Sequence, residues 1–468
     1  MILAPTRVVV GAGLALFVAV ALSFAWSART SESADDGSQS ITALIQRAAP
    51  GDTVRVPAGT YREQVVIDRP LTLIAEGVAT IDAGRTGDVV LVTADDVTLR
   101  GFMLTNSGRD VVAEPAGVRV RGSRATIEDN RLFDVLYGIV LEEGGGHRVS
   151  GNHVSSILEF NPERRGHALY LWHTDHNVIE GNTVTGAKDG IFLGFSSHNR
   201  VEGNVVTRAR YGIHYMYADD NVFLDNVFRD SVAGAAIMFS RGITFRGNEF
   251  AFNHSEASGY GLLFKDVDDV EMTDNLVHHN RVGMILEGAP LAPGATVTLS
   301  RNLIAFNDTA LLLATTTGAS FTENAFTGNL EQVAITGGSV EHRNKWSVEG
   351  RGNYWDDYRG YDANGDGVGD IPFRYEGAFD ELVRRSEWVR AYAFTPARST
   401  LELATRWFPA FRPDARVVDS SPLLSPPVAL TSGAGAADRA SALGFALGLL
   451  ALPLAFWRRM AVTRRAAW

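Results

Sequence analysis

Short runs of alternating hydrophobic and polar residues fill the chain between residues 117 and 329, and an asparagine recurs among them. These asparagines are Asn130, Asn152, Asn182, Asn204, Asn226, Asn248, Asn275, Asn302 and Asn324. Their spacings are 22, 30, 22, 22, 22, 27, 27 and 22 residues, which is typical of a solenoid of stacked coils. Alternation with period two predicts strands rather than helices, and Gly and Asn suit the corners because they tolerate positive φ. The pattern therefore predicts an all-β chain that folds as a parallel β-helix solenoid over residues 40–340.

The asparagines are expected to have a structural role, because an Asn at the same corner of every coil can stack into a hydrogen-bonded ladder. Each coil also has a small residue where one strand begins. These residues are Gly117, Gly138, Ala168, Gly190, Gly212, Ala236, Gly261, Gly283 and Ala310. Aligning the coils on them predicts which side chains lie above one another.

A short helix is predicted at the start of the solenoid. Ser40 is suited to N-cap it, and Ile41, Leu44 and Ile45 would share its apolar face. Such a helix would cover the first strand edges, which otherwise invite association with other chains. Residues 40–61 also resemble the opening of right-handed β-helix proteins related to polysaccharide lyases, a likeness that implies a right-handed solenoid but no particular function.

The far end of the solenoid is predicted to carry a second cap over residues 341–411. Apolar residues at three- and four-residue spacing predict helices over 379–388 and 399–408. Residues 412–439 are rich in Pro, Ser, Ala and Gly, which is typical of a linker.

Two apolar segments lie outside the predicted solenoid. Residues 1–28 combine one early basic residue with a long apolar run, which predicts a signal peptide or an N-terminal anchor, and 29–39 form a polar tether. Residues 440–457 are long enough to span a bilayer, so they predict a transmembrane helix, with a hydrophobic cap helix as the alternative. The Arg-rich tail 458–468 would lie in the cytoplasm. The solenoid is then periplasmic or otherwise extracytoplasmic, anchored to the cytoplasmic membrane by its C-terminal helix.

Composition excludes some classes of partner. The formal net charge is −11, and no cluster of Lys and Arg interrupts the repeats, which argues against binding nucleic acid. The chain has no cysteine, so disulfides and thiolate metal sites are excluded.

Alignment of the coils predicts two outward columns of side chains, because alternate residues of a strand point to opposite faces. The first column is Tyr170, Phe192, His214, Met238 and Leu263, and the second is Trp172, Gly194, Met216, Ser240 and Lys265. Large apolar side chains on a solvent-facing side usually mark a partner surface. We therefore predict a partner-binding surface made of Tyr170, Trp172, Phe192, His214, Met216 and Met238.

The same surface is a candidate copper site. His214 and Met238 are predicted one coil apart, and Met216 lies two residues along the strand from His214. An imidazole with thioethers is a soft ligand set that suits Cu(I). The alternative is that these residues only pack against a partner, since Met is common on adaptable binding surfaces.

A second candidate metal site lies in the predicted C-terminal cap. Asp362, Asn364, Asp366, the Val368 carbonyl and Asp370 match the first part of a calcium loop. The bidentate Glu that usually ends such a loop is missing, because its position is Phe373. A Gly-rich turn capped by its own side chains is the alternative.

No catalytic residues are predicted. β-Helix enzymes that cleave pectin need clustered acidic or basic residues on one outward face, whereas the outward columns here are apolar. Asp219, Asp220, Asp268 and Asp269 lie at corners, where Asp commonly makes turns. We therefore expect a protein that is not an enzyme.

Several stretches together resemble the NosD family of nitrous oxide reductase maturation proteins. They are residues 166–172, 214–217, 236–240, 350–355 with 362–370, 407–409 and 417–420. The resemblance implies an extracytoplasmic accessory protein that acts with an ABC transporter, both permease and ATPase, and with a copper-chaperone lipoprotein. Its implied role is assembly of the copper centre of nitrous oxide reductase, and copper binding is implied without a fixed set of ligands.

Two other interpretations stay open from the sequence. One is a surface β-helix that binds or processes carbohydrate, which incubation with uronate polymers would reveal. The other is a purely structural tether, which should tolerate combined changes at His214, Met216 and Met238.

Overall fold

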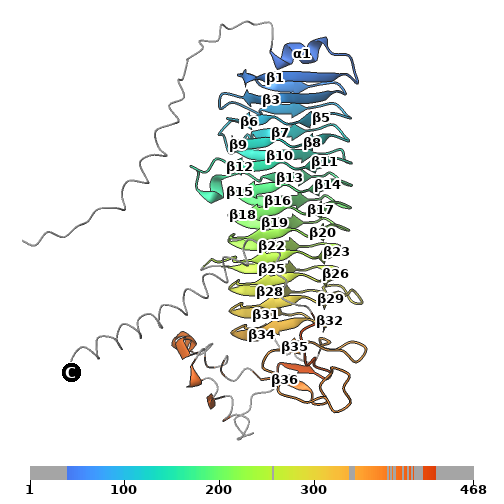
Figure 1. The fold of residues 1–468 in the computed structure, drawn as a ribbon, viewed down its shortest axis with the longest axis vertical. Helices are drawn as coiled ribbons and strands as arrows, with labels where there is room; N and C mark the ends of the chain where they lie inside the picture. Colours follow the sequence, from blue (N-terminus) through green and yellow to red (C-terminus); the bar gives the residue numbers. More distant parts are fainter. Residues whose placement is uncertain are drawn as a thin grey trace, which may run out of the picture.

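The computed structural model describes residues 40–427, except 256–257, 337–342, 377–378, 380–381, 383–385, 393–394, 398–399, 402–403 and 405–414. Its strands stack along one long axis as a parallel β-helix (Figure 1). A typical coil contributes two strands to a 23-stranded sheet, sheet A, and one strand to a 12-stranded sheet, sheet B. The predicted all-β parallel solenoid is therefore confirmed.

Sheet B consists of β2 (Val65–Ile67), β4 (Val90–Val92), β7 (Ala116–Val120), β10 (Tyr137–Glu142), β13 (Leu169–Trp172), β16 (Asp189–Gly194), β19 (Tyr211–Met216), β22 (Ala233–Met238), β25 (Tyr260–Lys265), β28 (Val282–Glu287), β31 (Thr309–Ala314) and β34 (Glu331–Thr336).

Sheet A consists of β1 (Thr53–Tyr61), β3 (Thr72–Asp82), β5 (Thr98–Arg100), β6 (Met103–Thr105), β8 (Thr126–Glu128), β9 (Arg131–Val135), β11 (Arg148–Ser150), β12 (His153–Ser156), β14 (Val178–Glu180), β15 (Thr183–Thr185), β17 (Arg200–Glu202), β18 (Val205–Thr207), β20 (Val222–Leu224), β21 (Val227–Arg229), β23 (Arg241–Arg246), β24 (Glu249–Ala251), β26 (Asp268–Thr273), β27 (Leu276–His278), β29 (Val297–Ser300), β30 (Leu303–Ala305), β32 (Ala319–Thr322), β33 (Ala325–Thr327) and β35 (Tyr354–Trp355).

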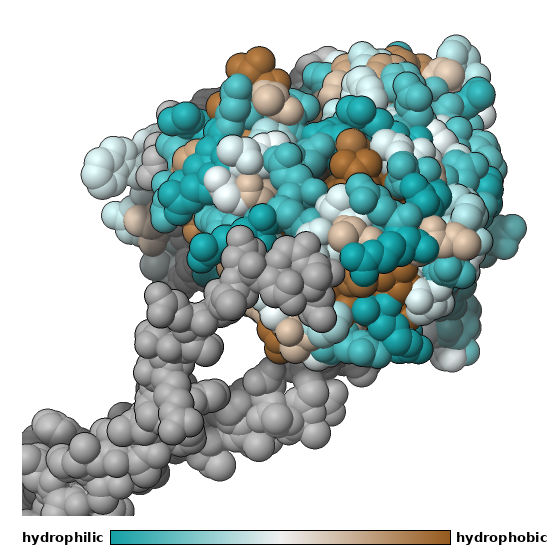
Figure 2. Space-filling model, turned by 90° about the horizontal axis from the view of Figure 1, so that it is seen from above, coloured by the Kyte–Doolittle hydropathy of each residue, from teal (hydrophilic) through white to brown (hydrophobic). Residues whose placement is uncertain are grey.

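Helix α1 (Ile41–Arg47) covers the first coil. The Ser40 hydroxyl accepts a hydrogen bond from the Ala43 amide at 3.0 Å, and Ile41 and Ile45 are buried. The Glu63 carboxylate accepts the Ile41 amide at 2.7 Å, which fixes the start of the helix to the first coil. This end of the molecule is mostly hydrophilic, with only separate hydrophobic patches (Figure 2).

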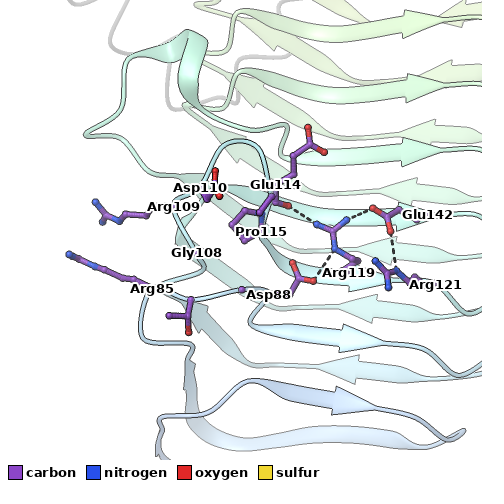
Figure 3. Close-up of a pocket in the computed structure, with 13 residues that line it drawn as sticks. Arg85, Asp88, Gly108, Arg109, Asp110, Glu114, Pro115, Arg119, Arg121 and Glu142 are labelled. Carbon is purple, nitrogen blue, oxygen red and sulfur yellow. Dashed lines mark hydrogen bonds and ion pairs between the residues drawn. The ribbon is translucent and has the colours of Figure 1, made fainter.

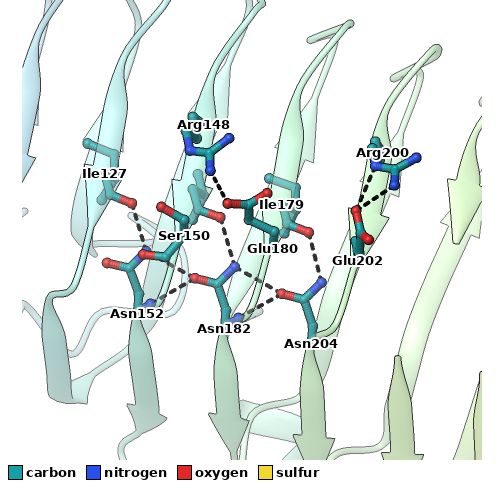
Figure 4. Close-up of polar contacts among 11 residues, drawn as sticks. Ile127, Arg148, Ser150, Asn152, Ile179, Glu180, Asn182, Arg200, Glu202 and Asn204 are labelled. Atoms are coloured by element: carbon teal, nitrogen blue, oxygen red, sulfur yellow. Dashed lines mark hydrogen bonds and ion pairs between the residues drawn. The ribbon is translucent and has the colours of Figure 1, made fainter. Parts of the chain in front are cut away.

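The repeated asparagines form the predicted ladder. Asn152 donates through its backbone and side-chain N–H groups to Asn182 Oδ1, both at 3.0 Å, and Asn182 does the same to Asn204 at 2.9 and 3.0 Å (Figure 4). The Nδ2 of each asparagine also donates to a carbonyl, as Asn204 does to Ile179 at 2.8 Å. The ladder satisfies buried backbone groups at a corner, and such groups are costly when unpaired.

The register of sheet B differs from the predicted alignment at one coil. Gly212 is followed in its column by Gly234 rather than Ala236, so His214 pairs with Ala236 and Met216 with Met238. A Cβ atom at Gly234 would lie 2.4 Å from the Gly261 carbonyl oxygen, which is why glycine occupies this crowded inner corner. The predicted alignment of Met238 with His214 is therefore wrong by two residues.

The C-terminal end closes on the last coils. β36 (Phe373–Tyr375) pairs antiparallel with β37 (Val417–Asp419), which lies inside the segment predicted as a linker. The Asp419 carboxylate accepts the Asn353 amide at 2.7 Å and so terminates the asparagine ladder. A 3₁₀ helix, η2 (Glu387–Tyr392), overlaps the end of the predicted helix 379–388 and extends beyond it. Much of both predicted helices, 379–388 and 399–408, falls outside the described residues.

The predicted signal peptide or anchor (1–28), tether (29–39), transmembrane helix (440–457) and basic tail (458–468) all lie outside the described residues. Within the described part of the chain, no helix has the length and apolar character needed to cross a bilayer.

Candidate partner and metal surface on sheet B

The predicted site residues come from four consecutive strands of sheet B, β13, β16, β19 and β22. Tyr170 pairs with Phe192, and Phe192 pairs with His214, which gives one outward column. Trp172, Gly194, Met216 and Met238 form the second column. Ser240, predicted in that column, is instead buried and accepts the Ala218 amide at 3.0 Å.

These outward side chains are half-buried because they pack on one another, while their neighbours in sequence point into the core. The Phe192 ring lies 5.1 Å from Tyr170 and meets His214 edge-on at 5.0 Å. A Cβ atom at Gly194 would lie 2.7 Å from the Trp172 ring, so the glycine leaves room for the indole. Aromatic pairs of this kind fix ring orientations as well as burying surface. The result is a rigid apolar surface beside the two methionines.

A charged cluster lies under the first column, centred on the buried Asp189. Arg210 donates to its two carboxylate oxygens at 2.9 and 2.8 Å, and His214 Nδ1 lies 2.8 Å from Oδ2. His167 Nδ1 is 3.2 Å from the same oxygen, within ion-pair distance but without hydrogen-bond geometry. Burial alone would raise the pKa of Asp189, but the contacts with His167, His214 and Arg210 outweigh it and hold that pKa well below its usual value. The carboxylate is therefore charged and orients both imidazoles.

His214 contacts Asp189 in this cluster and lies on the same strand as Met216. Its Nδ1 faces Asp189, and across the ring Nε2 makes no hydrogen bond within the described residues. An imidazole whose far nitrogen is held by a carboxylate is the usual arrangement of a metal-binding histidine. Met216 lies on the same face two residues along the strand, and Met238 is its neighbour on β22. One imidazole and two thioethers are donors of the kind that a soft metal ion prefers. Met238 adjoins Met216 rather than His214, and copper binding by these three residues stays a prediction.

The pattern used to align the coils does not single out Asp189, His167 or Arg210. Asp189 stands immediately before Gly190, and His167 stands immediately before Ala168, so both occupy equivalent positions on adjacent coils. Arg210 comes from the position two before Gly212 on the next coil. Asp189 and His167 could have been found by comparing the residues that immediately precede each small strand start, whereas Arg210 lies one position further back.

The acidic loop of the C-terminal cap uses its oxygens within the loop itself. Asp362 accepts the amides of Gly365 at 2.6 Å and Gly367 at 2.8 Å, and Asp366 accepts the Val368 amide at 2.8 Å. Asp370 accepts the Ala363 amide at 2.6 Å, and the Asn364 side chain donates to Asp366 at 2.9 Å. A calcium ion would have to compete with these bonds, and its binding stays a prediction. Across the described residues, no three His, Asp or Glu side chains gather into a metal-binding group.

A polar pocket of about 520 Å³ lies on an earlier part of the solenoid, beside the loop 108–115 (Figure 3). Arg119, nearly buried, pairs with Asp88 at 2.9 Å and with Glu142, and Arg121 also reaches Glu142 at 3.2 Å. These acids neutralise the arginines that they contact. None of the predicted site residues lines the pocket.

Comparison with known proteins gives a consistent result. A family described as periplasmic copper-binding protein (NosD) matches residues 148–360. The chain is 34% identical over 402 residues to the probable ABC transporter binding protein NosD of Stutzerimonas stutzeri, covering 83% of this chain and 90% of that protein. It is 35% identical over 387 residues to the protein of the same name from Pseudomonas aeruginosa, covering 80% and 88%.

Among solved structures, the chain is similar to the A-module of the mannuronan C-5 epimerase AlgE6 of Azotobacter vinelandii. The TM-score is 0.52 at 14% identity, and the match covers 67% of this chain and 94% of that one. At this level of identity the likeness concerns the fold alone.

Proposed function

Because the chain belongs to the NosD family, we propose that it is a periplasmic accessory protein that helps to assemble the copper centre of nitrous oxide reductase. The observation that carries this proposal is the alignment of His214, Met216 and Met238 on one outward face, with His214 held by Asp189. Copper is the cargo in this proposal, taken up by the thioethers and by His214 Nε2. Soft thioethers favour Cu(I), and neutral imidazole completes such a set.

The aromatic side chains of the two columns support docking of a partner next to the proposed copper ligands. Tyr170, Trp172 and Phe192 present apolar surface that is already rigid, so little side-chain entropy would be lost on binding. Aromatic side chains of this kind are common at the centres of interfaces. We infer that this surface receives either the copper-chaperone lipoprotein or the apo-reductase.

An ABC transporter is the third partner of the proposal, since the relatives from Stutzerimonas stutzeri and Pseudomonas aeruginosa are named as ABC transporter binding proteins. Its permease and ATPase would act from the membrane, to which the segment 440–457 would anchor this chain. The non-catalytic role follows the family and involves no reaction at Asp189.

A gene deletion with complementation tests the proposal. The deletion strain should export nitrous oxide reductase that is poor in copper and inactive, and the wild-type gene should restore it. The combined variant His214→Ala, Met216→Leu and Met238→Leu should fail to restore copper content. Met103→Leu, at a half-buried methionine of β6, is the matched control and should restore it fully. A copper-loaded, active reductase in the deletion strain would refute the proposal.

The cluster around Asp189 favours one second candidate, a carbohydrate-processing activity. A charged carboxylate with two imidazoles and a guanidinium is a set able to bind an acidic sugar and to move a proton. Incubating the full chain with alginate and pectate, and following the formation of unsaturated or epimerised products, tests this candidate. Activity that disappears in Asp189→Asn would support it over the copper role.

A further inference from the structure

Two adjacent histidines at the end of β27 bring their ring nitrogens together. His278 Nδ1 and His279 Nδ1 are 2.7 Å apart, within hydrogen-bond distance. Metal–imidazole bonds are about 2.0–2.1 Å, so two imidazoles that share a metal ion place their nitrogens roughly 3 Å apart. A small rotation of either ring therefore opens a position between them for a metal ion.

Each ring is held by a different neighbour. His278 Nε2 lies 3.4 Å from Glu249 Oε1, which sets the proton of the neutral ring on Nε2 and leaves a lone pair on Nδ1. His279 is sandwiched between Phe252, at 4.9 Å, and Phe306, at 5.2 Å. All three rings of this stack are exposed, so the site is open to solvent from one side. The rings thus have a fixed direction before any ligand arrives.

The contact between the two Nδ1 atoms requires one of them to donate a hydrogen bond and the other to accept it. When both Nδ1 atoms bind a metal ion, each neutral ring carries its proton on Nε2, and solvent can take the His279 proton from Nδ1 and return one to Nε2.

We propose that His278 and His279 form a second metal site, which takes a borderline divalent ion of the Cu(II) class. Imidazole without thioether suits such ions, and Cu(II) forms the most stable complexes among the divalent first-row metals. Two protein ligands leave positions open for water or for a donor group of another protein, as a site that exchanges its metal requires. The proposal does not depend on the function proposed above, because it uses none of the ligands on sheet B.

Titration of the purified full-length chain with Cu(II), followed by electron paramagnetic resonance, tests the site. The wild-type chain should show a signal with nitrogen hyperfine structure, and His279→Ala and His278→Ala should each lose it. His153→Ala removes an exposed histidine of β12 and is the matched control, so it should keep the signal. Met216→Leu with Met238→Leu should also keep it, which separates this site from the proposed Cu(I) ligands.

A further variant tests the site even if the two histidine variants fail to fold. Glu249→Gln removes only the carboxylate behind His278 and should weaken Cu(II) binding by about 10-fold or more. Circular dichroism reports the fold of each variant. A Cu(II) signal that survives in folded His279→Ala, or an affinity unchanged in Glu249→Gln, would overturn the proposal.

Discussion

Replacing Asp189 with Asn is the sharpest test of the cluster on sheet B. The carboxylate accepts two bonds from Arg210, at 2.9 and 2.8 Å, and one contact from His214 at 2.8 Å. Asparagine has nearly the same volume but only one acceptor oxygen, so its amide N–H₂ would face a donor of Arg210 or His214. The substitution therefore removes the charge and turns one hydrogen bond into a clash of donors.

The expected loss of stability follows from the burial of the pair. Removing one partner of a buried ion pair costs about 3–5 kcal/mol. The Arg210 side chain keeps 22% exposure and lies 3.5 Å from Glu163, so we expect a loss near the lower limit, about 3 kcal/mol. If His214 binds copper, releasing it from Asp189 should also weaken Cu(I) binding by about 10- to 100-fold.

The same charge predicts a pH dependence. The pKa of Asp189 is lower in the folded chain than in the unfolded one, so its stabilising contribution is complete at neutral pH. That contribution declines only as the pH falls below the unfolded-state pKa, about 3.9, toward the depressed value. Asp189→Asn should lack this part of the acid destabilisation.

Urea unfolding measures the loss of stability in Asp189→Asn, and a competition assay with a Cu(I) chelator measures its affinity for Cu(I). Asp88→Asn is the matched control, because Asp88 also pairs with a nearly buried arginine, Arg119, at 2.9 Å, away from the methionines. The control should lose stability but keep its affinity for Cu(I). Equal Cu(I) affinity in Asp189→Asn and the wild-type chain would refute the role of Asp189 in holding His214 for the metal.

Three further predictions concern the scaffold and the acidic loop. Asn204→Ala removes the oxygen that accepts the backbone and side-chain N–H groups of Asn182 inside the solenoid, so urea unfolding should show a loss of about 1–3 kcal/mol. Gly234→Ala places a Cβ atom 2.4 Å from a backbone carbonyl oxygen and should cost about 1–3 kcal/mol by the same measurement. Calorimetric titration with Ca²⁺ should give heat that is lost in Asp362→Asn; a wild-type chain with neither heat nor a change in melting temperature has no calcium site.

The solenoid could be predicted from the sequence because two separate features repeat with each coil, namely the hydrophobic alternation and the spacing of the asparagines. Both signals come from interactions that every coil repeats, namely core packing and the ladder from Asn130 to Asn353. The C-terminal strand β37 has no such repeat. Its pairing with β36 depends on contacts across a long stretch of sequence, which local composition does not reveal.

Register within one coil was harder to predict. Residues 233–236 read Ala-Gly-Ala-Ala, so size alone does not distinguish the strand start. Which of these residues occupies the aligned position depends on how closely the backbone of the next coil approaches, because the space beside Gly234 excludes even a methyl group. That distance arises only when the coils are stacked, so it cannot be predicted from the sequence of one coil.

The uniform coil length around the sheet B surface bears on its function. The asparagine spacing is 22 residues from Asn182 to Asn248, while the longer spacings of 30 and 27 lie on either side. Neighbouring strands are about 4.8 Å apart, so equal coils keep Met216 and Met238 side by side, as the proposed Cu(I) site requires. An insertion between these coils would turn one methionine away from the other, whereas insertions outside them leave the pair intact. The asparagine ladder and the methionine pair are therefore connected. The asparagines help to fix the register of the coils, and that register places Met216 beside Met238.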